Sequence, residues 1–162
     1  MRKAALSPSF DHYLSSFGDE DVIVLILKGH LVIEALLVEL LQTQGDSDIY
    51  WKWNFPKKCD ALIDKKLLSV EQAAALKDFN DIRNDIAHIL GHTVTFDRVF
   101  KLAGKLAAGG FDFSDDTIHQ NRKLSEEWYG ITGGLVDIIN SFYFDLAWIL
   151  QEAGGPDRTS GY

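Results

Sequence analysis

Apolar residues recur along this chain mostly at helical spacing, and strict alternation is confined to one short stretch. A long apolar run predicts a helix over residues 19–42. Its apolar side chains nearly encircle the axis, so we expect this helix at the centre of a bundle. Ser69 and Gln72 form a capping box that predicts a helix over residues 70–90, ended by Gly91. Apolar residues spaced three or four positions apart predict one buried face on that helix: Leu76, Phe79, Ile82, Ile86 and Leu90.

Four further segments have helical periodicity or helix boundary signals: residues 56–67, 96–107, 115–129 and 131–153. Residues 44–55 form a polar turn followed by alternating aromatic residues over 51–55. No second strand pattern exists to pair with these aromatic residues, so a loop across the bundle is expected over 44–55. The prediction is therefore an all-α fold, a compact up-and-down bundle of about five to six helices. It forms one domain over residues 1–162, with loosely ordered termini at 1–18 and 154–162.

Composition excludes several classes of protein. With 46% hydrophobic and 25% charged residues and only 3 Pro, the chain is neither disordered nor fibrous. A lone cysteine, Cys59, cannot form an intramolecular disulfide, which excludes a disulfide-stapled secreted scaffold. Acidic residues precede the first apolar run, which is the wrong flank for a signal peptide. Charged residues interrupt the apolar run over residues 22–41, so we expect a cytoplasmic protein with no membrane association.

The formal net charge of −8 argues against a coat-like nucleic-acid binder. The charge is unevenly distributed, however. Residues 51–108 carry 10 basic and 7 acidic groups, whereas the segments before and after them are strongly acidic. A small basic cleft in the middle segment therefore remains compatible with the composition. No helix shows clustered Arg or Lys of the recognition type, so sequence-specific DNA binding is not expected.

The most informative segment runs from Asp81 to His88. On a helical wheel one stripe holds Asp81, Asn84, Asp85 and His88. Arg83 precedes His88 by five residues, which places it about 140° around the axis. One ideal helix therefore cannot aim both side chains at one atom. They converge if the helix deforms near Gly91, or if a second copy of the helix faces the first across a two-fold axis.

This segment resembles a known family. The sequence R-N-D-I-A-H matches the Arg-x4–6-His motif of HEPN domains, named for higher eukaryotes and prokaryotes nucleotide-binding, and Asn84 is a residue type common after that arginine. The resemblance extends over most of the chain: a long apolar helix with an internal Glu (GHLVIEALLVELL), a short helix, and then the motif helix. The stretch from K-K-C-D-A-L-I-D through the motif is similar to the mannitol operon repressor branch.

The resemblance implies metal-independent RNA cleavage by a homodimer, with the site formed between two protomers, in defence or toxin-type RNA restriction. It implies that Arg83 stabilises the phosphate and His88 transfers protons, supported by Asn84, Asp85 and Glu34, with no metal or cofactor. These residue types suit the chemistry, because histidine titrates near neutral pH and arginine offers a permanently charged fork. Tyrosine is absent just beyond His88. HEPN toxins paired with a nucleotidyltransferase antitoxin often carry one there, which argues against that pairing.

Two other functions stay open. One is a non-catalytic regulatory or interaction module resembling the mannitol operon repressor family, with a protein partner. The other is nucleotide binding without cleavage. At the motif itself, the structural interpretation is that Arg83 pairs with an acidic residue of a neighbouring helix and His88 only caps its helix.

Single residues also have two interpretations each. His30 and Glu34, four apart in an apolar helix, are either a satisfied buried pair or reach toward Arg83. His88 and His92 have ligand-like spacing, but no further ligand accompanies them, so a zinc site is not expected. The aromatic residues over positions 50–55 either pack over the end of the bundle or stack on bases.

Overall fold

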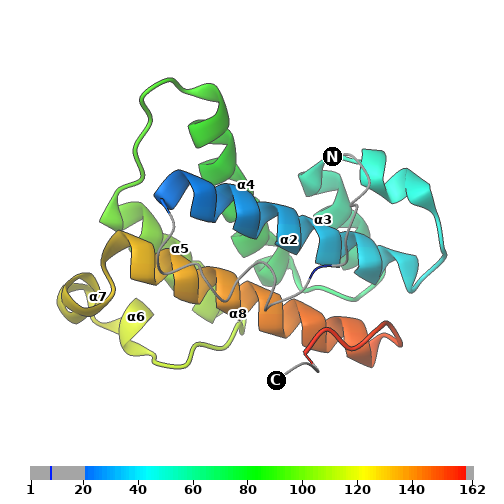
Figure 1. Ribbon diagram of the computed structural model, residues 1–162. Helices are drawn as coiled ribbons and strands as arrows, with labels where there is room; N and C mark the ends of the chain where they lie inside the picture. Colours follow the sequence, from blue (N-terminus) through cyan, green and yellow to red (C-terminus); the bar gives the residue numbers. More distant parts are fainter. Residues whose placement is uncertain (1–7, 9–20, 160–162) are drawn as a thin grey trace.

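The computed structural model describes residue 8 and residues 21–159. In this part of the chain the fold is all-α, with no strand, which confirms the predicted helical bundle (Figure 1). Seven α-helices and one 3₁₀-helix follow in order: α2 (Val22–Gln42), η2 (Asp48–Lys52), α3 (Phe55–Asp64), α4 (Val70–His88), α5 (Phe96–Ala108), α6 (Thr117–Gln120), α7 (Arg122–Trp128) and α8 (Gly130–Glu152).

The centre of the bundle is α2, as its pattern predicts. It lies along α8, and the two helices run in the same direction (Figure 1). Gly29 allows this close approach, because a Cβ there would lie 2.6 Å from Cδ1 of Ile139. Helices α3 and α4 pack against α2, and α5 packs against α4 and α8. Buried residues from all five of these helices form one large hydrophobic core.

Among the described helices, α8 is the one long and apolar enough to cross a membrane by length and composition. In the bundle, 56% of its apolar window is buried, and the helix packs against α2 and α5. This burial is what a core helix of a folded domain requires.

The helix that carries the motif, α4, begins as predicted. Ser69 accepts a hydrogen bond from the Gln72 backbone N–H at 3.0 Å, and the Gln72 side chain accepts one from the Ser69 N–H at 2.9 Å. It ends at His88 rather than at residue 90, because Ile89 adopts an extended conformation. The prediction that Leu90 belongs to the buried face is therefore wrong, since its side chain is fully exposed. The last turns of α4 project beyond the neighbouring helices (Figure 1).

Two local predictions differ from the structure. The helix expected over residues 115–129 is divided into α6 and α7 at Asn121, whose extended backbone ends the first helix. The Asn121 side chain then caps α7 by accepting a hydrogen bond from the backbone N–H of Leu124 at 3.1 Å. The segment expected as a loop over residues 44–55 contains η2, and its buried Trp51 packs against Ala35 and Val38 of α2.

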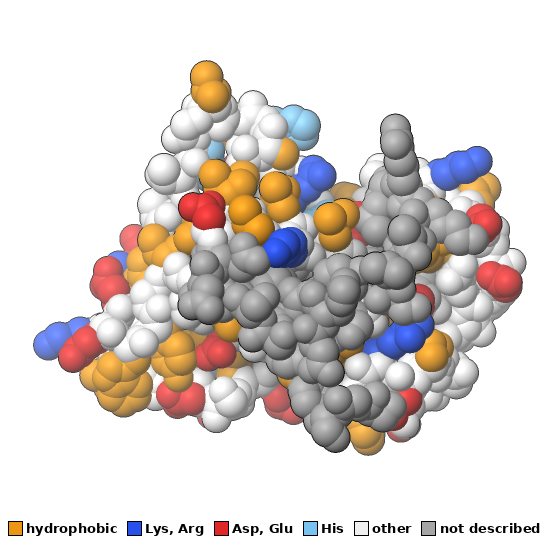
Figure 2. Space-filling model, viewed as in Figure 1, with side chains coloured by type: hydrophobic (Ala, Val, Ile, Leu, Met, Phe, Trp, Pro, Cys, Tyr) orange, Lys and Arg blue, Asp and Glu red, His pale blue; other side chains and the backbone are white. Residues whose placement is uncertain are grey.

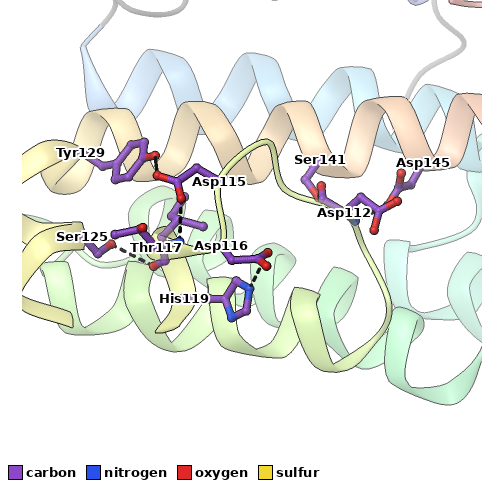
Figure 3. Close-up of polar contacts among 10 residues, drawn as sticks. Asp112, Asp115, Asp116, Thr117, His119, Ser125, Tyr129, Ser141 and Asp145 are labelled. Carbon is purple, nitrogen blue, oxygen red and sulfur yellow. Dashed lines mark hydrogen bonds and ion pairs between the residues drawn. The ribbon is translucent and has the colours of Figure 1, made fainter. Parts of the chain in front are cut away.

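The loop after α5 is fastened to α8 and α7 by side chains (Figure 3). Asp145 accepts a hydrogen bond from the backbone N–H of Asp112 at 2.8 Å, and the Ser141 hydroxyl donates to the Asp112 carbonyl at 2.7 Å. The Tyr129 hydroxyl donates to Asp115 at 2.6 Å, which lowers the pKa of that carboxyl and raises the pKa of Tyr129 to about 12. These contacts hold the loop in place.

The predicted loose C-terminus is wrong for residues 154–159. Arg158 makes a two-pronged ion pair with Glu39 of α2, at 2.6 and 2.9 Å, and its carbonyl accepts a hydrogen bond from the Tyr143 hydroxyl. These contacts tie the segment after α8 to the centre of the bundle. Residues 160–162, and the N-terminal segment predicted to be loose apart from residue 8, lie outside the described residues.

Candidate functional site

Helices α2, α3 and α4 enclose a surface pocket of about 590 Å³. This volume is within the range of small-molecule sites in proteins. Its floor consists of three buried polar side chains, and Arg83 stands at its edge. The full lining is His30, Leu31, Glu34, Asn54, Phe55, Pro56, Asn80, Asp81, Arg83 and Asn84.

A buried hydrogen bond links α2 to α4 at the floor of the pocket. Nε2 of His30 and Oδ1 of Asn80 are 2.9 Å apart. Because an amide oxygen only accepts, the His30 Nε2 carries the proton and donates. Burial lowers the pKa of His30, and the nearby Glu34 carboxylate opposes this shift only in part. The imidazole is therefore neutral at pH 7, and its Nδ1 presents a lone pair.

An ion pair lies beside this histidine. Lys58 of α3 is completely buried, and its Nζ donates a hydrogen bond to Oε1 of Glu34. The other oxygen of Glu34, Oε2, lies 3.8 Å from Nδ1 of His30. Without Lys58, the buried Glu34 carboxylate would lack compensation for its lost hydration. His30 and Glu34 are thus buried, but each finds its main partner on another helix rather than in the other.

Arg83 is half-buried, and its Nη1 donates to Oδ1 of Asn84 at 3.1 Å. No Asp or Glu in the described part of the chain forms an ion pair with it. The structural interpretation predicted that Arg83 pairs with an acidic residue of a neighbouring helix. No such pair forms among the described residues. Guanidinium carries five N–H donors in a fixed fork. Most of the Arg83 donors remain available at the edge of the pocket.

The predicted site residues are only partly brought together. Glu34, Arg83 and Asn84 line the pocket, whereas Asp85 and His88 do not. His88 is exposed as the last residue of α4, and Asp85 is half-buried, with its backbone carbonyl accepting from Ile89. This separation follows from the five-residue spacing between Arg83 and His88 on a regular helix.

Sequence reasoning missed two residues of this site, Asn80 and Lys58. Asn80 precedes Arg83 by three residues and Asn84 by four, so it shares their side of α4, and this spacing could have identified it. Lys58 follows Phe55 by three residues and precedes Leu62 by four, which places it on the buried face of α3. A lysine on an apolar face is a signal for a buried acidic partner.

A second pocket, of about 490 Å³, lies at the end of α2 and is lined by Glu39, Gln42, Asp46, Ser47, Asp48 and Trp51. Its three carboxylates and absence of a lining cation disfavour phosphate. Among the described residues, no group of three or more His, Cys, Asp or Glu side chains is placed to hold a metal ion. The pocket beside Arg83 is therefore the better candidate for an anionic ligand.

Comparisons of the chain with protein-family models, with curated proteins and with solved structures found no match. The candidate site consequently rests on its own geometry and on the motif of α4.

Proposed function

We propose that the protein is a HEPN-like, metal-independent endoribonuclease that acts as a homodimer, with Arg83 stabilising the phosphate and His88 transferring protons. One observation carries this proposal. Arg83 stands at the edge of an open pocket with a polar floor, and it has no acidic partner among the described residues. An arginine placed in this way is suited to bind phosphate oxygens with two parallel hydrogen bonds.

The proposed reaction needs one base, one acid and one cation. A neutral His88 takes the proton of a ribose 2′-hydroxyl, whose oxygen attacks the adjacent phosphorus. The same His88, now protonated, gives its proton to the 5′-oxygen as the P–O5′ bond breaks. The products are a 2′,3′-cyclic phosphate and a 5′-hydroxyl end, and Arg83 stabilises the additional charge on the phosphate.

Two features support a homodimer. First, His88 lies outside the pocket that Arg83 lines, so convergence on one phosphate requires a second copy of α4. Second, exposed apolar side chains adjoin the site: Ile23, Leu27 and Leu31 at intervals of four on α2, and Ile89 and Leu90 after α4. Figure 2 shows hydrophobic and basic side chains next to one another over α4 and the beginning of α2. Such an apolar surface is typical of a protein–protein contact.

A second candidate is a non-catalytic regulatory or interaction module, of the kind the mannitol operon repressor branch suggests. The fully exposed Leu90 beyond the end of α4 favours it, because this residue can contact a protein partner without any RNA. In that case the pocket binds a ligand without turnover, and His88 is dispensable.

The test is incubation of the purified protein with varied RNAs in EDTA, followed by analysis of the product ends. The nuclease proposal expects 2′,3′-cyclic phosphate ends and a loss of about 100-fold or more in rate for His88→Ala. His92→Ala is the matched control, because it removes another imidazole four residues away, and it should cleave normally. Absence of cleavage, or cleavage that survives His88→Ala, overturns the proposal. Partner binding that depends on Leu90 but not on His88 supports the second candidate.

A further inference from the structure

The floor of the pocket holds three polar atoms with unused hydrogen-bonding capacity. Asn80 uses its Oδ1 to accept from His30, which leaves the two N–H groups of Nδ2 as donors. His30 uses Nε2, which leaves the Nδ1 lone pair as an acceptor. Glu34 uses Oε1 for Lys58, which leaves Oε2 as a second acceptor. The two acceptors lie 3.8 Å apart with no donor between them.

These atoms face the pocket rather than a closed interior. The three side chains are only 4–5% exposed, and all three line the pocket. Within the described residues, the side-chain atoms that are sealed from solvent without a partner lie elsewhere, on Trp51, Asp78 and Asn140. The floor is therefore a reachable array of one donor group and two neighbouring acceptors, built from buried side chains.

We propose that this array binds the guanine base of RNA, with the attached phosphate at Arg83. The Watson–Crick edge of guanine presents one acceptor, O6, followed by two donors, N1–H and N2–H. O6 accepts from Asn80, and the two donors reach the neighbouring acceptors on His30 and Glu34. RNA-binding proteins read unpaired bases in this way, by hydrogen bonds to that edge.

The other three bases fit the array less well. Adenine and cytosine each present one amino donor beside a ring acceptor, so one lone pair of the base would face the lone pair of His30 or the Glu34 carboxylate. Uracil has a single donor between two acceptors. A buried acceptor that meets another acceptor stays unpaired, which costs more than a lost hydrogen bond. Guanine alone supplies a donor for each of the two acceptors.

The surroundings suit a neutral base with a phosphate attached. Leu31 and Pro56 offer apolar contacts at the wall of the pocket. The charge of Glu34 is balanced by Lys58, so the floor does not repel the nucleotide as a whole. The inference deepens the proposed function and rests on it, because that function supplies RNA as the source of the base.

The experiment is calorimetric titration of the unmodified protein with the 3′-monophosphates of guanosine, inosine, adenosine, cytidine and uridine. We expect guanosine 3′-monophosphate to bind about tenfold or more tightly than the adenosine, cytidine and uridine compounds. The inosine compound, which lacks the N2 amino group, should fall between them. Equal binding of all nucleotides, a preference for another base, or no binding overturns the inference.

A matched pair of variants localises the preference. Asn80→Asp still accepts from His30 but replaces the donor toward O6 by an acceptor, so the preference for guanosine should disappear. Asn121→Asp makes the same chemical change at the cap of α7, outside the pocket, and should bind as the unmodified protein does. A preference that persists in a folded Asn80→Asp variant overturns the assignment. If Asn80→Asp fails to fold, the nucleotide series on the unmodified protein still tests whether the pocket prefers guanine.

The same series separates this inference from the proposed function. Selective binding of guanosine 3′-monophosphate without RNA cleavage would support the guanine pocket and overturn the nuclease proposal. Cleavage that depends on His88 but shows no preference for the bond after guanosine would support the nuclease proposal. It would overturn the guanine pocket.

Discussion

His30 of α2 donates a hydrogen bond from Nε2 to Oδ1 of Asn80 of α4, over 2.9 Å, beneath the pocket that Arg83 lines. The bond joins two residues 50 positions apart in the chain, and it fixes which end of the Asn80 amide faces the pocket. It also fixes the imidazole tautomer, so one contact orients both a donor and an acceptor of the site. Stability and recognition therefore depend on the same pair of residues.

The first prediction concerns this pair. Asn80→Ala removes the acceptor and leaves a buried N–H of His30 unsatisfied, so the free energy of unfolding should fall by about 1–3 kcal/mol. Asn80→Asp keeps the acceptor but buries a second carboxylate beside Glu34, so it should lose at least as much. Urea denaturation followed by circular dichroism measures both values. An Asn80→Ala variant as stable as the unmodified protein would show that the bond contributes nothing.

The buried pair of Lys58 and Glu34 gives a second prediction. Lys58→Met leaves the Glu34 carboxylate buried without its partner, and we expect a loss of about 3–5 kcal/mol in the free energy of unfolding. Replacing both residues, as in Glu34→Leu with Lys58→Met, should restore much of that stability, because no charge is then buried. A double variant less stable than Lys58→Met alone would contradict this account.

The control for this experiment is the more exposed ion pair between Lys77 and Asp60. Lys77→Met should change the free energy of unfolding by only about 0–1 kcal/mol, because solvent screens the pair. Equal effects at Lys58 and Lys77 would mean that burial does not set the energy of the Glu34 pair.

The helices could largely be predicted from the sequence, since local signals decide them. The capping box at Ser69 placed the start of α4, and apolar periodicity placed α2 and α8. Long-range contacts could not be predicted from the sequence, and they explain the two predictions that were wrong. The segment after α8 is ordered by the Arg158–Glu39 pair, whose members are 119 residues apart. Leu90 fits the apolar pattern of α4 but lies beyond the surface that α4 packs against.

The candidate site was predicted in part for a similar reason. The motif identified Arg83 and Asn84, which the structure places at the pocket. Asn80 and Lys58 were missed because their partners, His30 and Glu34, lie on another helix, and only the folded chain brings them together. Whether His88 acts with Arg83 stays a prediction, since it depends on a second copy of the chain.

Cys59 supplies a third prediction. The thiol is completely buried, and burial raises its pKa to about 12. The thiolate is the reactive form, so the native protein should resist a thiol reagent such as Ellman's reagent at pH 8. In 6 M urea, about enough to unfold a small domain, one thiol per chain should react rapidly. Absorbance at the wavelength of the released thiolate follows the reaction. Fast reaction of the native protein would mean that α3 opens readily.

A fourth prediction uses the half-buried Asp137 of α8. Burial raises the pKa of this carboxyl above its ordinary value of 3.8, and Asp115 adds to the shift. The native state therefore binds the proton more tightly than the unfolded state, and stability falls as the pH rises from below 3.8 through the raised pKa. Asp137→Asn removes this loss, so its Tm should exceed that of the unmodified protein at pH 7. The difference should vanish below pH 3.8.

Asp97 provides a control of opposite sign. Its hydrogen bond and ion pair with Arg122 lower the pKa of the carboxyl, so its charge stabilises the protein above pH 3.8. Asp97→Asn should therefore lower the Tm at pH 7 slightly, and this difference should also vanish in acid. Thermal scans of both variants between pH 3 and 7 give the comparison. A lower Tm for Asp137→Asn at pH 7 would contradict the assigned direction.

The fifth prediction tests whether two chains share one site. Arg83→Ala and His88→Ala should each be inactive toward RNA alone. If Arg83 of one chain acts with His88 of its partner, a mixed dimer of the two variants regains one complete site. In an equal mixture half of the dimers are mixed, so about a quarter of the unmodified activity should return after subunit exchange. Mass spectrometry of differently tagged chains verifies the exchange. Verified mixed dimers that stay inactive would exclude a site assembled from Arg83 of one chain and His88 of the other.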